Sequence, residues 1–183
     1  MSLALVHSRA RDGVRAPAVR VEVHLSGGLP VMTIVGLPEA AVRESKDRVR
    51  AAIQNAQFEF PQRRITVNLA PADLPKDGAR LDLPIALGIL AASGQIPLEQ
   101  LARCEFLGEL ALTGELRAVD GVLPAAIAAT ADERTLFLPQ ANGAEAALVS
   151  GVAARTARTL LEICAHLQGA KVLPEAIAEP VIE

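Results

Sequence analysis

Residues 64–94 read RITVNLAPADLPKDGARLDLPIALGILAASG, and they contain the clearest structural signals of the chain. The apolar alternation in residues 64–69 predicts a strand, and residues 71–82, with two prolines, three aspartates and a glycine, predict a loop. Residues 83–92 are apolar on every side. Pro84 near their start and Ser93-Gly94 at their end indicate a buried helix rather than a strand. A chain of 183 residues is long enough to bury such a helix.

Strand and helix patterns alternate along the rest of the chain. Residues 19–25 and 29–35 predict two strands paired as a hairpin through Ser26-Gly27-Gly28. We therefore expect an α/β (α+β) fold, with helices packed against a mixed sheet. An acidic segment with two prolines, residues 174–183, predicts a loose tail or linker. Further strands are expected at 104–112, 115–118, 135–138 and 152–154, and further helices at 39–56, 122–131, 141–149 and 156–167.

The composition argues against several classes of protein. Only 2% of residues are aromatic, with four Phe and no Trp or Tyr, so recognition by stacking on aromatic platforms is not expected. A net charge of −3 argues against a protein that is basic all over. The longest apolar run, residues 83–92, is about half the length of a membrane-spanning helix. Without a secretory leader, and with Cys104 and Cys164 far apart, we expect a soluble cytoplasmic protein with no membrane partner.

The sequence predicts no cofactor site and no metal site in this chain. The Gly-Lys dipeptide that closes a phosphate-binding P-loop never occurs. The three histidines are scattered, without the spacing of metal ligands. The acidic residues Asp73, Asp77 and Asp82 could hold a hard cation weakly, but a solvated, turn-forming loop is the favoured interpretation.

Basic residues are concentrated in the first part of the chain. Residues 1–70 carry ten Lys/Arg and six Asp/Glu, or +4, and the remaining residues carry eight and fifteen, or −7. Such a distribution can neutralise phosphates without reading base sequence, so DNA contact is expected to be electrostatic and confined to the first seventy residues. From the residues alone a solvated helix face is somewhat favoured, because the neighbouring carboxylates Glu44 and Asp47 would dilute the positive field. The candidate contacts are the helical stripe Arg43, Lys46 and Arg50, together with Arg63 and Arg64.

Five motifs resemble a known family. They are GLP at 36–38, ESKDRVR at 44–50, ITVNLAPADLPKDG at 65–78, DLPIA at 82–86 and GEL at 108–110. Together they closely resemble the N-terminal domain of the ComM/YifB family, the magnesium-chelatase-like AAA+ ATPases of bacteria. The same block is more distantly similar to the Lon-like domains of the RadA recombination factor and of Lon protease.

This resemblance implies a Lon protease-type domain with a ribosomal-protein-like β-α-β core. The domain would cover residues 1–172, and residues 173–183 would lead toward an AAA+ module.

The similarity to Lon makes peptidase activity a hypothesis to weigh. Lon-type peptidases use a Ser nucleophile activated by a Lys base. In that family the Ser follows a Lys-Asp-Gly loop, and the Lys lies on the helix after a Gly-Glu-Leu hairpin. Here the matching loop, Lys76-Asp77-Gly78, continues ARLD, and the matching helix reads VLPAAI at 122–127. Both members of the dyad are missing, so a Ser–Lys peptidase is disfavoured and no catalytic residue is assigned.

The resemblance implies a non-catalytic domain of a hexameric ATPase that acts on DNA, as a branch-migration helicase in recombination and natural transformation. The domain would aid ring assembly or contact DNA independently of sequence, so its partners would be copies of itself and DNA. ATP and Mg²⁺ would bind the AAA+ module rather than this chain. A pure oligomerisation domain stays open as an alternative. Metal insertion into a porphyrin is not favoured, because no porphyrin pocket with a central His or carboxylate is evident.

Overall fold

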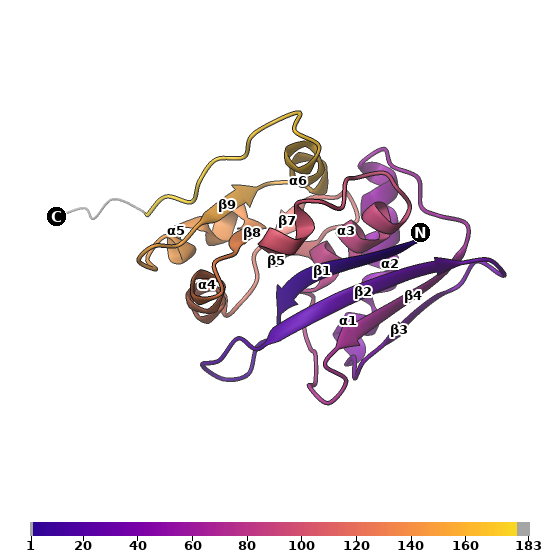
Figure 1. The fold of residues 1–183 in the computed structure, drawn as a ribbon, viewed down its shortest axis with the longest axis horizontal. Coiled ribbons are helices and arrows are strands. Elements are labelled where there is room, and N and C mark those ends of the chain that lie inside the picture. Colours follow the sequence, from indigo (N-terminus) through magenta and orange to yellow (C-terminus); the bar gives the residue numbers. More distant parts are fainter. Residues whose placement is uncertain (1, 179–183) are drawn as a thin grey trace.

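A seven-stranded mixed sheet forms the centre of the fold in the computed structural model, which describes residues 2–178. The strand order is β3-β4-β2-β1-β5-β8-β9, so the first strand of the chain lies in the middle (Figure 1). The expected α/β class is confirmed. The sheet strands are β1 (Leu3–Arg9), β2 (Ala18–Ser26), β3 (Met32–Val35), β4 (Arg64–Ala70), β5 (Cys104–Phe106), β8 (Thr135–Pro139) and β9 (Ala154–Ala157), and a separate pair is formed by β6 (Glu109–Leu110) and β7 (Leu116–Arg117).

Helices cover different parts of this sheet. One packs on β1 and β2 and is covered in turn by the helix before it, whereas three shorter helices contact β8 and β9 in the other half of the molecule (Figure 1). Within residues 2–178, no helix is both long and apolar enough to cross a bilayer. The helices are α1 (Ala40–Arg43), α2 (Ser45–Asn55), α3 (Asp82–Ala92), α4 (Val122–Ala131), α5 (Gly143–Ala146) and α6 (Leu160–Leu167), with short 3-10 helices η1 (Leu101–Arg103) and η2 (Gln140–Asn142).

Helix α3 is buried on every side, as its sequence predicts. All eleven of its residues are buried, from Asp82 to Ala92. The helix ends where Gly94 adopts a left-handed conformation, with φ of 78°, and the Gln95 amide donates to the Leu90 carbonyl at 2.8 Å. This is the bond pattern of a Schellman cap, which satisfies the last carbonyls of a helix.

Gly88 allows α3 to lie close to the sheet. A Cβ atom at this position would lie 2.5 Å from Cγ2 of Val23 on β2 and 3.6 Å from Cγ2 of Val6 on β1. Both valines are fully buried. The missing side chain therefore fixes the spacing between α3 and the two central antiparallel strands.

The predicted hairpin between residues 19–25 and 29–35 is wrong. Both strands exist, but β4 lies between them, antiparallel to β2 and parallel to β3. Val67 is thereby the neighbour of both Val23 and Ile34, and all three side chains are buried. The segment between the two strands contains Gly27, Gly28 and Pro30. It crosses the sheet at the first residues of β4 instead of closing a tight turn.

Several predicted elements differ in their limits. The expected helix 39–56 is interrupted at Glu44, where α1 ends and α2 begins. The strand expected at 104–112 is split, because its second half leaves the main sheet and pairs with β7. Thr156 and Ala157 belong to β9, and α6 begins only after Thr159, whose side chain accepts the Glu162 amide at 3.1 Å. The helix at 141–149 is reduced to η2 and α5.

Strand β1 was not among the predicted elements. Its exposed positions include Leu3 and Leu5, and its buried positions include Ala4 and Val6. Because both faces carry apolar residues, the period-two contrast that reveals a half-buried strand is weak.

A buried ionic cluster joins β1 to β5. Arg9 makes a two-bond contact with Glu105, at 2.7 and 2.8 Å, and also reaches Asp132 at 2.5 Å. Arg134 donates to the same glutamate at 3.2 Å. Beside this cluster, the Ser8 hydroxyl donates to the Phe106 carbonyl at 2.6 Å. Pairing leaves neither Arg9 nor Glu105 as an uncompensated buried charge at the junction between the two halves of the sheet.

The chain after α6 packs along β9. The Thr156 amide donates to the Pro174 carbonyl at 3.2 Å, and the Ala176 amide donates to Ala154 at 2.9 Å. Nδ1 of His166 accepts the Leu173 amide at 3.0 Å. The first residues of the expected loose tail are thus hydrogen-bonded to the sheet, and residues 179–183 lie outside the described part of the chain.

We predict that Gly88→Ala destabilises the fold, because the added methyl group would overlap Val23. Overpacking of this kind costs about 1–3 kcal/mol, against a gain of about 1 kcal/mol in helix propensity. Chemical denaturation should show a lower free energy of unfolding for Gly88→Ala. Gly27→Ala, which meets open space, should leave that free energy unchanged. Adding Val23→Ala should cost less in the Gly88→Ala background than in the wild type; equal costs would contradict the proposed overlap.

We also predict acid destabilisation through His166. Burial, followed by the nearby Arg155, lowers the pKa of this imidazole, so the unfolded chain binds the proton more tightly. The free energy of unfolding should therefore fall as the pH drops below the ordinary histidine pKa. His166→Asn keeps an acceptor for the Leu173 amide and should reduce this dependence. Part of the pH dependence should remain in this variant, because burial also lowers the pKa of His7. An unchanged profile in His166→Asn, measured by denaturation across pH, would contradict the assignment.

Candidate functional site

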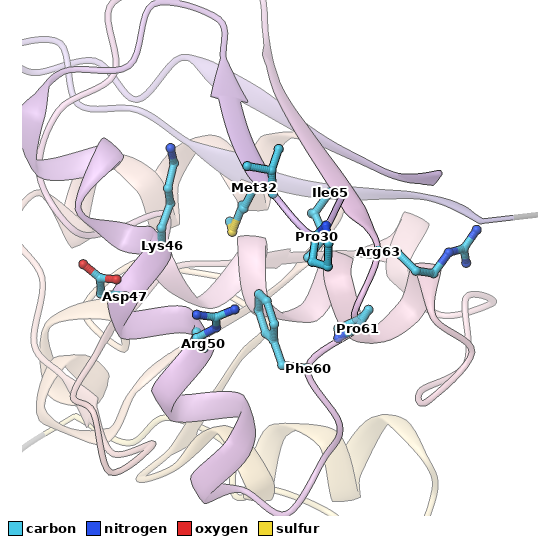
Figure 2. Close-up of a pocket in the computed structure, with 10 residues that line it drawn as sticks. Pro30, Met32, Lys46, Asp47, Arg50, Phe60, Pro61, Arg63 and Ile65 are labelled. Atoms are coloured by element: carbon cyan, nitrogen blue, oxygen red, sulfur yellow. The ribbon is translucent and has the colours of Figure 1, made fainter. Parts of the chain in front are cut away.

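A groove of about 210 Å³ lies between α2 and the start of β3 and β4. Figure 2 shows Lys46, Asp47 and Arg50 projecting from α2 on one side of it. The opposite wall and the floor come from the segment before β3 and from the segment that leads into β4. The groove is lined by Pro30, Val31, Met32, Lys46, Asp47, Arg50, Phe60, Pro61, Arg63 and Ile65.

The groove has a cationic rim around an apolar interior. Lys46 and Arg50 make no ion pair with any carboxylate of residues 2–178. The Asp47 carboxylate points away from Phe60, and the Arg50 guanidinium points toward it (Figure 2). Asp47 also lines the groove, so the α2 side of the rim carries two cations and one carboxylate.

The structure brings three of the five predicted basic contacts to one groove. Lys46 and Arg50 lie on its α2 side, and Arg63 lies at its far end, where it donates to the Ser2 hydroxyl at 3.0 Å. Arg43 and Arg64 are exposed but do not line the groove. Arg43 lies in α1, on the other side of the break at Glu44. Arg64 is exposed on the face of β4 opposite to that of the buried Ile65.

Phe60 is the groove residue that the sequence analysis missed. The Arg50 guanidinium carbon lies 5.0 Å from the centre of its ring, within the range of a cation–π contact. Its place in the groove depends on the parallel pairing of β3 with β4, which brings Met32 beside Ile65. In the sequence, Phe60 and Pro61 stand shortly before the basic pair at 63 and 64, which could have pointed to them. Their position beside α2 follows only from the strand order, which the sequence did not predict.

A buried carboxylate holds α2 in position beside the groove. Asp82, at the start of α3, accepts hydrogen bonds from the Ser45 hydroxyl, from Nε of Arg48 at 2.7 Å and from the Leu110 amide at 3.0 Å. Burial raises the pKa of Asp82, and these hydrogen bonds oppose that shift. The same bond to Asp82 raises the pKa of Arg48. Because Ser45 and Arg48 flank Lys46, this contact fixes the turn of α2 that presents the rim.

In the loop Lys76-Asp77-Gly78, the lysine has a structural role. Lys76 is 1% exposed, and its Nζ donates to the carbonyls of Gly36 at 2.7 Å, Leu69 at 2.9 Å and Pro71. Burial lowers the pKa of this amine. All three ammonium protons therefore have acceptors, and the lysine ties the end of β4 to the segment after β3.

A second cavity lies between the segment 77–80 and the residues just before α4. This cavity, of about 340 Å³, is lined by Arg11, Asp77, Gly78, Ala79, Arg80, Glu109, Ala118, Val119 and Asp120. Arg80 is 5% exposed and donates to the Asp120 carbonyl. Burial lowers the pKa of its guanidinium, an effect to which Arg11 adds. The lining contains no Ser, Cys or Lys that could serve as nucleophile or base.

Within residues 2–178, the Lys76 loop and the acidic residues of 73–82 are not arranged as a phosphate-binding loop or as a metal site. Lys76, the lysine of the glycine-containing loop, is fully used by backbone carbonyls. The three aspartates of residues 73–82 do not converge, because Asp82 is turned inward to Arg48 and Ser45. Over residues 2–178, no group of three or more His, Cys, Asp or Glu side chains is arranged to hold a metal.

Comparisons with known proteins identify the family of this chain. The family model described as subunit ChlI of Mg-chelatase matches residues 21–142, a range that contains every residue of the groove. The competence protein ComM of Haemophilus influenzae is 57% identical over 176 residues, which is 96% of this chain and 35% of that protein. The YifB proteins of Salmonella typhimurium and Escherichia coli are each 50% identical, over 98% and 92% of this chain.

The chain belongs to the ComM/YifB family and corresponds to its N-terminal, ChlI-like region. The family resemblance expected from the sequence is thereby confirmed. The chain spans about a third of the length of the curated relatives it matches.

We predict that Arg48→Ala destabilises the chain, because Asp82 is left buried without its cation. The expected loss is about 3 kcal/mol, the low end for breaking a buried pair, since a fifth of the Arg48 side chain is exposed. The loss should shrink at acidic pH, where the unpaired carboxyl takes up a proton. Arg43→Ala, which removes an exposed arginine without an ion pair, is the matched control. Equal unfolding free energies for the two variants would contradict the role of Asp82.

Proposed function

We propose that this chain is a non-catalytic, DNA-contacting domain of a ComM-like AAA+ ATPase, which acts in recombination and natural transformation. The observation that carries the proposal is the groove beside α2, where Lys46, Arg50 and Arg63 surround an apolar interior. None of these three cations has an acidic partner within residues 2–178, so they are available to phosphates. Contacts of this kind neutralise the nucleic-acid backbone without reading its sequence.

Family membership supports the biological side of this proposal. The relative in Haemophilus influenzae is named a competence protein, and this chain matches it at 57% identity. In the proposed arrangement the domain belongs to a homo-oligomeric ring, hexameric in the full-length protein. ATP and Mg²⁺ bind a separate AAA+ module, and this domain supplies a surface for DNA. The alternative of a pure oligomerisation domain shares the ring but predicts no role for the groove.

The proposal includes a cytoplasmic location, where DNA and ATP are available. Cys104 and Cys164 are both free thiols in the interior, and burial raises the pKa of Cys104 to about 11 and that of Cys164 to about 12. Buried, protonated thiols of this kind need no oxidising compartment.

The test is salt-dependent binding of labelled DNA to the 183-residue chain. The double charge reversal Lys46→Glu/Arg50→Glu should weaken binding and lower the slope of log K against log salt by roughly 1.4–1.8, as expected for two lost phosphate contacts. The effect should be the same for unrelated base sequences, because phosphate contacts carry no sequence information.

The matched control is Arg117→Glu/Lys171→Glu, which makes the same change in net charge at two exposed positions outside the groove. This control should retain the wild-type slope. An equal loss in both double variants would show a general charge effect and contradict the groove as the contact. Absence of salt-dependent binding in the wild-type chain would overturn the proposal and favour the oligomerisation domain.

A further inference from the structure

The interior of the basic groove is more apolar than phosphate binding requires. The rim carries three cations, Lys46, Arg50 and Arg63, and one carboxylate, Asp47; the rest of the lining consists of prolines, aliphatic or thioether side chains and one aromatic ring. A duplex presents its sugar–phosphate backbone to a protein surface and keeps its base faces stacked inside the helix. A contact limited to that backbone gains nothing from an apolar floor. The apolar residues of the groove are Pro30, Val31, Met32, Phe60, Pro61 and Ile65.

One part of this interior has the chemistry that recognises a flat base. Phe60 is half-buried and packs against the main core, so its ring is held in place. The Arg50 guanidinium lies over that ring, with its central carbon 5.0 Å from the ring centre (Figure 2). Unstacked bases bind on aromatic rings and on arginine planes, and these contacts tolerate any base, because every base has a π-face.

The size of the groove limits what can enter it. Its volume of about 210 Å³ is below the ≈ 300–1,000 Å³ of clefts that enclose drug-sized ligands. A single planar ring system suits that space better than a larger ligand does. Lys46 and Arg63 place a cation at each end of the groove (Figure 2).

We propose that the groove binds single-stranded DNA, with one unstacked base held against Phe60 and Arg50 and the flanking phosphates held by Lys46 and Arg63. This inference rests on the proposed function and narrows its substrate to unpaired strands. It does not use the extended aromatic platform against which the composition argues. The chain lacks an aromatic platform in its composition, but one ring beside an arginine suffices for one base.

The experiment compares three labelled ligands of equal length on the 183-residue chain: an oligothymidylate, the same backbone without bases, and a duplex. The oligothymidylate should bind more tightly than the abasic strand, because only it can place a base in the groove. Phe60→Leu keeps an apolar side chain but removes the π-face, and it should weaken oligothymidylate binding by about tenfold. Binding of the abasic strand and of the duplex should change little.

Phe58→Leu is the matched control, because Phe58 also packs half-buried against the core but does not line the groove. It should leave all three affinities unchanged, and thermal denaturation should show that both leucine variants are folded. Equal affinity for the oligothymidylate and the abasic strand, or an equal effect of Phe60→Leu on all three ligands, would overturn the single-strand inference while leaving the electrostatic DNA contact intact. No binding of any ligand by the wild-type chain would overturn both.

Discussion

The fold depends on burying one helix on every side. Helix α3 has no polar face, so the sheet must cover one side of it and α2 must cover another. Gly88 sets the distance to the sheet, and Asp82 at the start of the helix binds Arg48 of α2. The contact at Gly88 requires that no side chain be present, whereas the contact at Asp82 requires a buried charge. Together they place the elements that surround the groove.

The packing of α2 and the sheet against α3 leaves the groove at the margin of the core, and basic side chains line its rim. Its apolar interior comes from residues at the margin of the core, and its rim comes from the outer side of α2 and the start of β4. A rigid support suits such a surface, because side chains held by the core lose less entropy on binding. The cavity at Arg80 differs in kind: guanidinium groups and carboxylates share it, and its lining contains no Ser, Cys or Lys.

Local patterns in the sequence predicted elements but not their neighbours. Strand β4, helix α3 and helix α4 follow from periodicity and from proline and glycine positions, and all three occur where expected. The pairing of strands could not be predicted from such patterns. The alternation of buried and exposed residues in β2 and β3 is the same whether the two strands pair with each other or with β4 between them. The basic residues were visible in the sequence, whereas Phe60 acquired a role only through this strand order. Long-range register is set by the whole core and not by a local pattern.

The central position of β1 has a consequence for synthesis of the chain. Its first neighbour, β2, follows at once, but Ser8 on its other side meets Phe106, ninety-eight residues later. At a translation rate of about 5–20 residues per second, this edge of the nascent sheet waits roughly 5–20 s for its partner. During that interval the β1–β2 ribbon displays an open row of backbone donors and acceptors beside the exposed Leu3 and Leu5. Until β5 has been synthesised, this edge of β1 therefore lacks the strand that pairs with it in the folded chain.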